Sequence, residues 1–232
     1  MTEINGWEIS SETLDGRTVT LCARRKENLP LILINAVHED SELILHSCVR
    51  HNCPAFQMVM ISDFPWDESL SPWQEPPVIS DEDHFTGGAR EYSEWLDTRL
   101  LPYAAKKLPP VREYVIAGYS MGGLFAVYVP YVSRSWDRCV CGSGSVWFPG
   151  FLQYALSTPF EKKPLSVYMS LGTKETESHV EALTKTRDIM GQLKTFYEAQ
   201  GIDTVFVENP GNHFTDVPQR MAKGIKWTVQ DG

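Results

Sequence analysis

The stretch Y-V-I-A-G-Y-S-M-G-G-L-F at residues 114–125 passes from an apolar strand pattern into a helical pattern, with Ser120 at the corner. It contains the motif G-x-S-x-G, from Gly118 to Gly122. Between a strand and a helix, such a serine stands on a sharp turn, and the next backbone N–H points to where an oxyanion would form. The pattern predicts that Ser120 is a nucleophile. The alternative is a bystander serine in a glycine-rich turn.

A serine nucleophile needs a base, and the base needs a carboxylate to orient it. On this architecture the three residues follow in the order serine, acid, histidine. Two histidines follow the serine, His179 and His213. His213 lies in the loop N-P-G-N-H-F after the last apolar strand, at the sheet edge where open α/β folds build their sites. Because His179 falls inside an expected helix, we predict that His213 is the base.

The acid is expected just after the strand S-V-Y-M-S-L-G, where L-G-T-K-E-T-E-S supplies Glu175 and Glu177. Glu175 stands three residues after Gly172, close enough to the strand end to be held in the loop. Glu177 is expected at the next helix, whose N-terminus favours a carboxylate for electrostatic reasons alone. We favour Glu175, with Glu177 as the alternative and Glu208 as a weaker third choice.

An oxyanion needs two N–H donors aimed at the developing charge. By position, the first is the backbone N–H of Met121, directly after the nucleophile. The second is expected in the loop after L-I-L-I-N, which indicates Val37 or, as a second choice, Ala36.

Strand and helix patterns alternate along the chain. The Asp15-Gly16 dipeptide predicts a type I′ turn between two strands within residues 6–25. Further strands are expected at 29–36, 56–62, 112–118, 137–145, 164–172 and 202–208, and helices at 40–53, 88–107, 121–129, 177–200 and 216–229. The helix at 40–53 is expected to be capped by Asp40 or Ser41. This alternation predicts an α/β fold, mostly parallel with an antiparallel N-terminal hairpin and helices on both faces, and residues 1–232 are interpreted as one domain.

The composition excludes several classes of function. The 232 residues carry a net charge of −9 at pH 7, which argues against nucleic acid and against an anionic membrane surface as partners. The longest apolar run, residues 29–37, is too short to cross a bilayer, and the acidic N-terminal segment is unlike a secretory signal. Five cysteines in a chain of this length do not predict a disulfide framework. We interpret the chain as a cytoplasmic protein with reduced thiols.

Residues 38–53 must be considered as a metal site, because histidine and cysteine gather there: His38, His46, Cys48, His51 and Cys53. On a helix, His46 and Cys48 point to different faces, and the segment has no C-x-x-C pair. We therefore predict no metal and attribute the cysteines to packing of the helix against the sheet.

The segment 62–83 carries seven acidic residues and no Lys or Arg. Such a run is ordinarily a solvated loop. The functional interpretation is that it borders the substrate pocket through Trp66 and Trp73, with Trp147 and Phe148 as another wall. The substrate would then be a small molecule that is neutral or carries an apolar or aromatic group, since anionic substrates would be repelled. Core packing is the alternative for each aromatic residue.

Four segments together resemble an esterase family of the α/β-hydrolase fold that includes siderophore (enterochelin-type) esterases, S-formylglutathione hydrolases and feruloyl or acetylxylan esterases. They are, in family order, Y-V-I-A-G-Y-S-M-G-G-L-F-A-V-Y, C-G-S-G-S-V-W-F-P-G-F, S-L-G-T-K-E and N-P-G-N-H-F. The resemblance implies an α/β-hydrolase fold and a cofactor-independent serine carboxylic-ester hydrolase. The family's acid is usually an aspartate, where this chain has Glu175. A thioesterase, peptidase or acyltransferase would use the same residues, and a non-catalytic binding protein of this fold is the alternative from another class.

Overall fold

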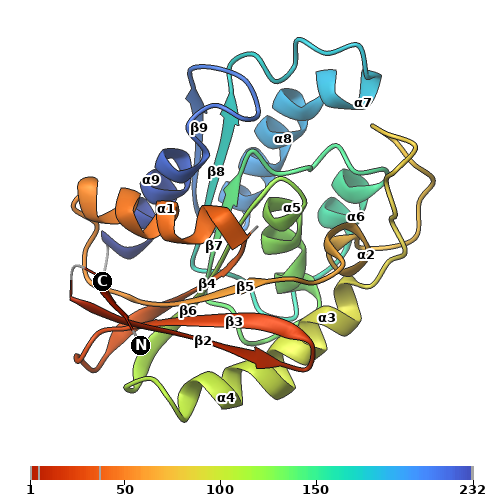
Figure 1. Cartoon of the computed structure of the whole chain (residues 1–232). Coiled ribbons are helices and arrows are strands. Elements are labelled where there is room, and N and C mark those ends of the chain that lie inside the picture. Colours follow the sequence, from red (N-terminus) through yellow and green to blue (C-terminus); the bar gives the residue numbers. More distant parts are fainter. Residues whose placement is uncertain (1, 5, 37, 231–232) are drawn as a thin grey trace.

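The computed structural model describes residues 2–4, 6–36 and 38–230 (Figure 1). Within them, nine strands form one sheet in the order β1-β2-β3-β5-β4-β6-β7-β8-β9. The strands are β1 (Thr2–Ile4), β2 (Trp7–Leu14), β3 (Arg17–Ala23), β4 (Leu29–Asn35), β5 (Gln57–Ser62), β6 (Val111–Tyr119), β7 (Arg138–Gly142), β8 (Ser166–Gly172) and β9 (Asp203–Asn209). Pairing is antiparallel from β1 to β5 and parallel from β5 to β9, which confirms the predicted sheet.

The N-terminal hairpin turns at the predicted dipeptide. Leu14 pairs with Arg17 across the turn. Asp15 and Gly16 have φ of 50° and 82°, and a type I′ turn needs positive φ at both central positions. The hairpin therefore follows from local chemistry alone.

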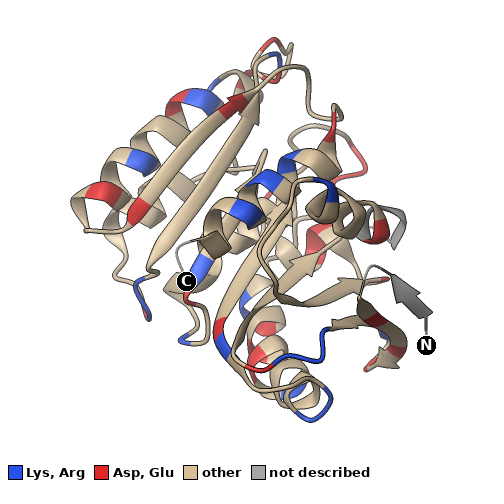
Figure 2. Cartoon of the chain, turned by 90° about the vertical axis from the view of Figure 1, so that its left-hand side faces the viewer, with Lys and Arg blue, Asp and Glu red and all other residues tan. Residues whose placement is uncertain are grey.

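Helices cover both faces of the sheet. They are α1 (His38–Arg50), α2 (Trp66–Leu70), α3 (Ala89–Trp95), η1 (Leu96–Leu100), α4 (Leu101–Ala105), α5 (Met121–Tyr128), η2 (Val129–Tyr131), α6 (Phe151–Ser157), α7 (Glu181–Thr184), α8 (Thr186–Ala199) and α9 (Val217–Gln230). Helices α1 and α9 lie side by side on one face, while α3, α5, α6 and α8 lie on the other (Figure 1). Seen from the side in Figure 2, α9 carries basic residues and ends at the C-terminus.

Two buried clusters lie on opposite faces of the sheet, and β6, the strand before Ser120, contributes to both. Val115 and Ala117 belong to the cluster under α1 and α9, while Ile116 belongs to the cluster under α5. Successive side chains of a strand point to opposite faces, so a continuous apolar run is what a doubly covered strand requires. Packing on both faces holds β6 in place and so fixes the position of Ser120 at the end of this strand.

Some predicted helix boundaries were wrong. Helix α1 begins at His38, so neither Asp40 nor Ser41 is its N-cap. The helix expected from residue 177 begins only at α7, because the segment before it continues the loop after β8. The structure adds α6, whose seven residues are too short to give a periodic signal.

Candidate active site

Ser120 joins β6 to α5 in a strained conformation, with φ 56° and ψ −122°. A non-glycine residue held in such a region costs about 1–3 kcal/mol and persists only where its surroundings impose it. A Cβ added at Gly118 would lie 2.2 Å from Gly122 O, and one added at Gly123 would lie 2.8 Å from Gly144 Cα. Gly118 of the motif and Gly123 directly after it therefore allow the close approach that this turn needs.

The loop between β9 and α9 carries His213. Its Nδ1 lies 2.8 Å from Glu175 Oε2, and its backbone carbonyl accepts a hydrogen bond of 2.7 Å from the Tyr119 hydroxyl. An ionised carboxylate can only accept, so Nδ1 carries the hydrogen and Nε2 is left with its lone pair. Ser120 and His213 line the same two cavities.

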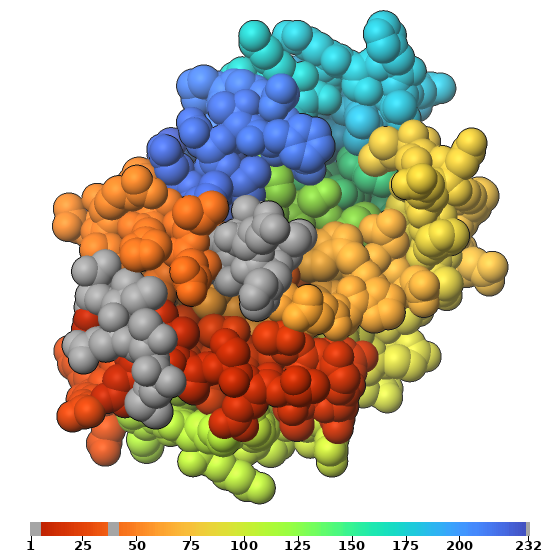
Figure 3. All heavy atoms as spheres, viewed as in Figure 1, coloured from red at the N-terminus to blue at the C-terminus, as the bar shows by residue number. Residues whose placement is uncertain are grey.

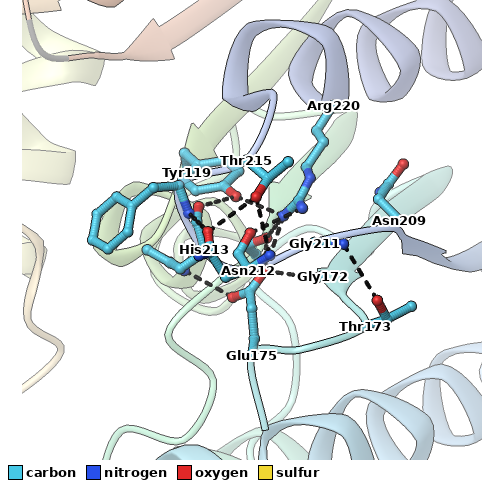
Figure 4. Close-up of polar contacts among 12 residues, drawn as sticks. Tyr119, Gly172, Thr173, Glu175, Asn209, Gly211, Asn212, His213, Thr215 and Arg220 are labelled. Carbon is cyan, nitrogen blue, oxygen red and sulfur yellow. Dashed lines mark hydrogen bonds and ion pairs between the residues drawn. The ribbon is translucent and has the colours of Figure 1, made fainter. Parts of the chain in front are cut away.

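Glu175 follows β8, and its side chain is 8% exposed. Its second oxygen, Oε1, accepts hydrogen bonds from Gly172 N at 2.6 Å, Ser143 Oγ at 2.7 Å and Arg220 Nη1 at 3.0 Å (Figure 4). Burial alone would raise the pKa of Glu175. The hydrogen bonds from His213 and Ser143 outweigh burial and hold this pKa below its ordinary value. The carboxylate is thus ionised and fixed beside the imidazole.

The other candidate acids lie elsewhere. Glu177 is exposed, as is His179 two residues later. The carboxylate of Glu208 pairs with Arg187 at 2.5 Å. The structure brings Glu175 to His213, rather than either alternative.

Three backbone N–H groups were predicted as donors to an oxyanion, and two of them lie within the described residues. Met121 is the first residue of α5, so its N–H is among those that a helix leaves without an intrahelical acceptor. The N–H of Ala36, the second choice for the other donor, donates to Ile61 O at 3.1 Å and extends the sheet. Val37, the first choice, lies outside the described residues.

Two cavities of about 220 and 200 Å³ meet at Ser120, His213 and Phe214. Figure 3 shows a hollow here, where green atoms of the chain around residue 120 lie between the blue C-terminal part and the yellow loop. The lining of the first cavity is mostly apolar and includes Ile34, Ile44, Trp66, Val217 and Met221. The second includes Ile79, Ser143, Ser145, Trp147 and Leu183. No Lys or Arg is among the described lining residues of either cavity.

No family model and no curated protein matches this chain. Among solved structures, it is similar to the siderophore hydrolase EstA from Aspergillus nidulans, with a TM-score of 0.76 at 16% identity over 98% of this chain and 97% of that one. It is also similar to an IroE-like serine hydrolase from Shewanella oneidensis, with a TM-score of 0.81 at 15% identity over 97% of this chain and 80% of that one. The fold is that of the α/β hydrolases. A ferulic acid esterase shares it, with a TM-score of 0.65 at 14% identity over 97% of this chain and 98% of that one.

The four aromatic residues proposed for the substrate pocket divide into two pairs. Trp66 lines the first cavity and Trp147 the second. The Trp73 indole N–H donates to Pro149 O at 3.1 Å, and its ring packs against Phe148, which is buried in the core. Trp73 and Phe148 therefore pack within the fold and lie outside the described lining of both cavities.

Phe214 and Ile79 are among the cavity residues that the sequence analysis did not single out. Phe214 is 84% exposed and lines both cavities, directly after His213. Ile79 lies in the acidic segment and lines the second cavity. Its position is held by Asp83, whose carboxylate accepts hydrogen bonds from the backbone N–H of residues 78, 79 and 80. The signal that the sequence offered for Phe214 was an aromatic residue directly after the predicted base.

Among the described residues, no group of three or more His, Cys, Asp or Glu side chains is placed to hold a metal ion. In the segment 38–53, Cys48 is a buried residue of α1, and Cys53 Sγ donates to Ala222 O at 3.5 Å. Nor does the described part of the chain contain a helix long and apolar enough to cross a membrane.

Proposed function

We propose that this protein is a serine hydrolase that cleaves a carboxylic ester through an acyl-enzyme on Ser120. One observation carries the proposal: a serine held on a strained turn and a histidine paired with a buried carboxylate line the same two cavities. The similar structures support it, since their names are siderophore hydrolase, serine hydrolase and ferulic acid esterase.

In the first half-reaction, Ser120 Oγ attacks the ester carbonyl carbon while His213 Nε2 takes the hydroxyl proton. The carbonyl oxygen becomes an oxyanion, which accepts a hydrogen bond from the Met121 N–H and, as we propose, from Val37. Glu175 holds the imidazole in the required tautomer and stabilises the imidazolium. When the tetrahedral intermediate collapses, the C–O bond to the alcohol breaks, and the leaving oxygen takes the proton from His213.

The second half-reaction releases the acid. His213 removes a proton from a water molecule, and the resulting hydroxide attacks the acyl carbon. Collapse of this intermediate breaks the bond to Ser120 Oγ, which recovers its proton from His213. The products are a carboxylic acid and an alcohol, and no cofactor takes part.

The proposed substrate is a small, uncharged ester with an apolar or aromatic group. Two cavities of about 220 and 200 Å³ meet at the nucleophile, so the acyl and alcohol parts can occupy one each. A cavity of about 150 Å³ lined by apolar side chains already accommodates benzene, so either cavity is large enough for an aromatic ring. Without Lys or Arg among the described lining residues, an anionic group would find no cation to pair with.

We also propose that the enzyme works in the cytoplasm. All five cysteines are free, and four of them are buried, as suits a compartment in which thiols stay reduced.

A panel of p-nitrophenyl esters, a thioester and a peptide substrate tests the reaction class. We expect turnover of short apolar and aromatic esters, and its loss in Ser120→Ala. The exposed Ser157→Ala on α6 is the control. A preference for the thioester or peptide would identify another acyl reaction. Equal turnover by wild type and Ser120→Ala would overturn the assigned nucleophile, and no turnover of any substrate would favour the non-catalytic binding protein.

A further inference from the structure

Arg220, in the first turn of α9, is buried although it is charged, with only 1% of its side chain exposed. Among the residues whose side-chain burial the structure describes, no other charged residue is buried to this degree. The first turn of a helix is also the positive end of its dipole, where a cation is disfavoured. A buried cation at such a place needs strong compensation from its partners.

The compensation comes from five acceptors at the carboxyl edge of the sheet. They are Glu175 Oε1 at 3.0 Å, Tyr119 Oη at 3.0 Å, Ser143 Oγ at 3.3 Å, Pro210 O at 3.0 Å and Asn212 O at 2.9 Å. Figure 4 shows Arg220 reaching from the helix toward Tyr119, Glu175 and Asn212. They belong to the ends of β6 and β7, the loop after β8 and the loop after β9, so one side chain joins four segments.

Three of these contacts connect the loop that carries the base to the loop that carries the acid. Pro210 and Asn212 belong to the turn that leads into His213, and one guanidinium nitrogen donates to both of their carbonyls. The other nitrogen donates to Glu175 on the adjacent loop. The guanidinium is a rigid planar fork, so it fixes the spacing of the two loops in a way that the single ammonium of a lysine cannot.

The same contact has an electrostatic effect. Glu175 presents Oε1 to Arg220 at 3.0 Å and Oε2 to His213 at 2.8 Å. Among the described residues, Tyr119 is a further titratable group that faces His213, with its ring centroid 5.2 Å from the imidazole. A permanent positive charge on the far side of the carboxylate offsets part of its attraction for an imidazolium.

We propose that Arg220 is a positioning residue that holds Glu175 and His213 in register and lowers the pH at which His213 becomes available as a base. The proposal rests on the proposed function for its kinetic consequence, while its structural and electrostatic content concerns His213 itself. It assigns a role to a side chain other than the three side chains, Ser120, His213 and Glu175, that the proposed ester mechanism uses.

Two substitutions separate the two effects. Arg220→Lys keeps the charge but loses the fork, whereas Arg220→Gln removes the charge. Lys226→Gln is the matched control, because Lys226 is a cation on the same helix whose Nζ donates to His51 O, away from the site. Each variant is measured for kcat and KM on a p-nitrophenyl ester. Each is also prepared in a Ser120→Ala background, where an NMR titration of the His213 ring requires no turnover.

We expect kcat to fall by about tenfold or more in both Arg220 variants, with KM changed by less than about twofold, because the reacting groups rather than the ester are displaced. The pH at which the His213 signal is half shifted should rise by about half to one unit in Arg220→Gln, because removing a cation eases protonation. It should stay at the wild-type value in Arg220→Lys and Lys226→Gln.

Wild-type kcat in Arg220→Lys would overturn the positioning role, and an unshifted His213 titration in Arg220→Gln would overturn the electrostatic one. If circular dichroism shows that Arg220→Gln does not fold, Arg220→Lys still decides the positioning role. Tyr119→Phe provides a second comparison, in which the charge of Arg220 is kept. That variant removes one acceptor and should leave the His213 titration near wild type. If the wild type hydrolyses no ester, the proposed function fails, while the NMR titration still decides whether Arg220 sets the protonation of His213.

Discussion

Replacing Glu175 by glutamine tests the proposed acid sharply, because the site dictates how the new amide must lie. Donors converge on Oε1, at 2.6 Å from Gly172 N, 2.7 Å from Ser143 Oγ and 3.0 Å from Arg220 Nη1. Only the amide oxygen can accept from them, so the amide nitrogen must face His213 Nδ1. It then donates to Nδ1, and the imidazole hydrogen moves to Nε2, the atom that has to accept the proton of the nucleophile.

We expect kcat of Glu175→Gln to fall by about 10⁴-fold, equivalent to about 5 kcal/mol of activation free energy, with KM little changed. The assay is the initial rate of p-nitrophenyl butyrate hydrolysis as a function of substrate concentration, with circular dichroism to verify folding. Glu177→Gln is the matched control, since Glu177 lies exposed in the same loop. A Glu175→Gln enzyme within about tenfold of wild type, or a larger loss in Glu177→Gln, would refute the reasoning.

Three further predictions concern stability, pH and binding. Gly118→Ala should lower the free energy of unfolding by about 3 kcal/mol or more in a urea titration, because its Cβ would lie 2.2 Å from a carbonyl oxygen. Gly191→Ala on α8 is the control: no atom lies within 4 Å of its Cβ, so it should raise the free energy of unfolding by up to about 1 kcal/mol. An equal effect of the two substitutions would contradict the close packing described for the turn at Ser120. Because its pKa is lowered, ionised Glu175 contributes stability that is complete above the ordinary pKa of 4.5 and is lost as pH falls through the lowered pKa. The difference in melting temperature between wild type and Glu175→Gln should therefore shrink below about pH 4.5. A difference that stays constant with pH would contradict this prediction. Phe214→Ala should raise KM for aromatic esters by about tenfold with an unchanged melting temperature, since the ring is 84% exposed; an unchanged KM would remove Phe214 from the substrate site.

The features that could be predicted from the sequence depend on local chemistry. Asp15-Gly16 indicated the hairpin because few dipeptides adopt positive φ at both positions. The elbow was indicated by glycines around Ser120, and His213 by its place after the last strand. The fold prediction is confirmed by the strand order and by the similar structures. The catalytic roles and the single-domain interpretation stay predictions.

The remaining features depend on groups that meet only after folding. Arg220 stands in an amphipathic helix, and nothing in the neighbouring sequence distinguishes it from an exposed surface arginine. Whether an aromatic ring lines a cavity or packs in the core is also a tertiary property, so Trp66 and Trp73 could not be told apart in one loop. The second oxyanion donor was assigned by position alone. Of its two candidates, Ala36 is engaged in the sheet, and Val37 stays a prediction.

Covalent labelling with a fluorophosphonate tests the central claim most directly, because it asks only whether Ser120 is an activated nucleophile in the folded protein. The labelled protein is digested, and the modified peptide is identified by mass spectrometry, with Ser120→Ala and heat-denatured protein as controls. The account predicts a single adduct on Ser120 in the folded wild type and none in either control. Folded protein that stays unlabelled at Ser120, or that carries its adduct on another serine, would contradict it.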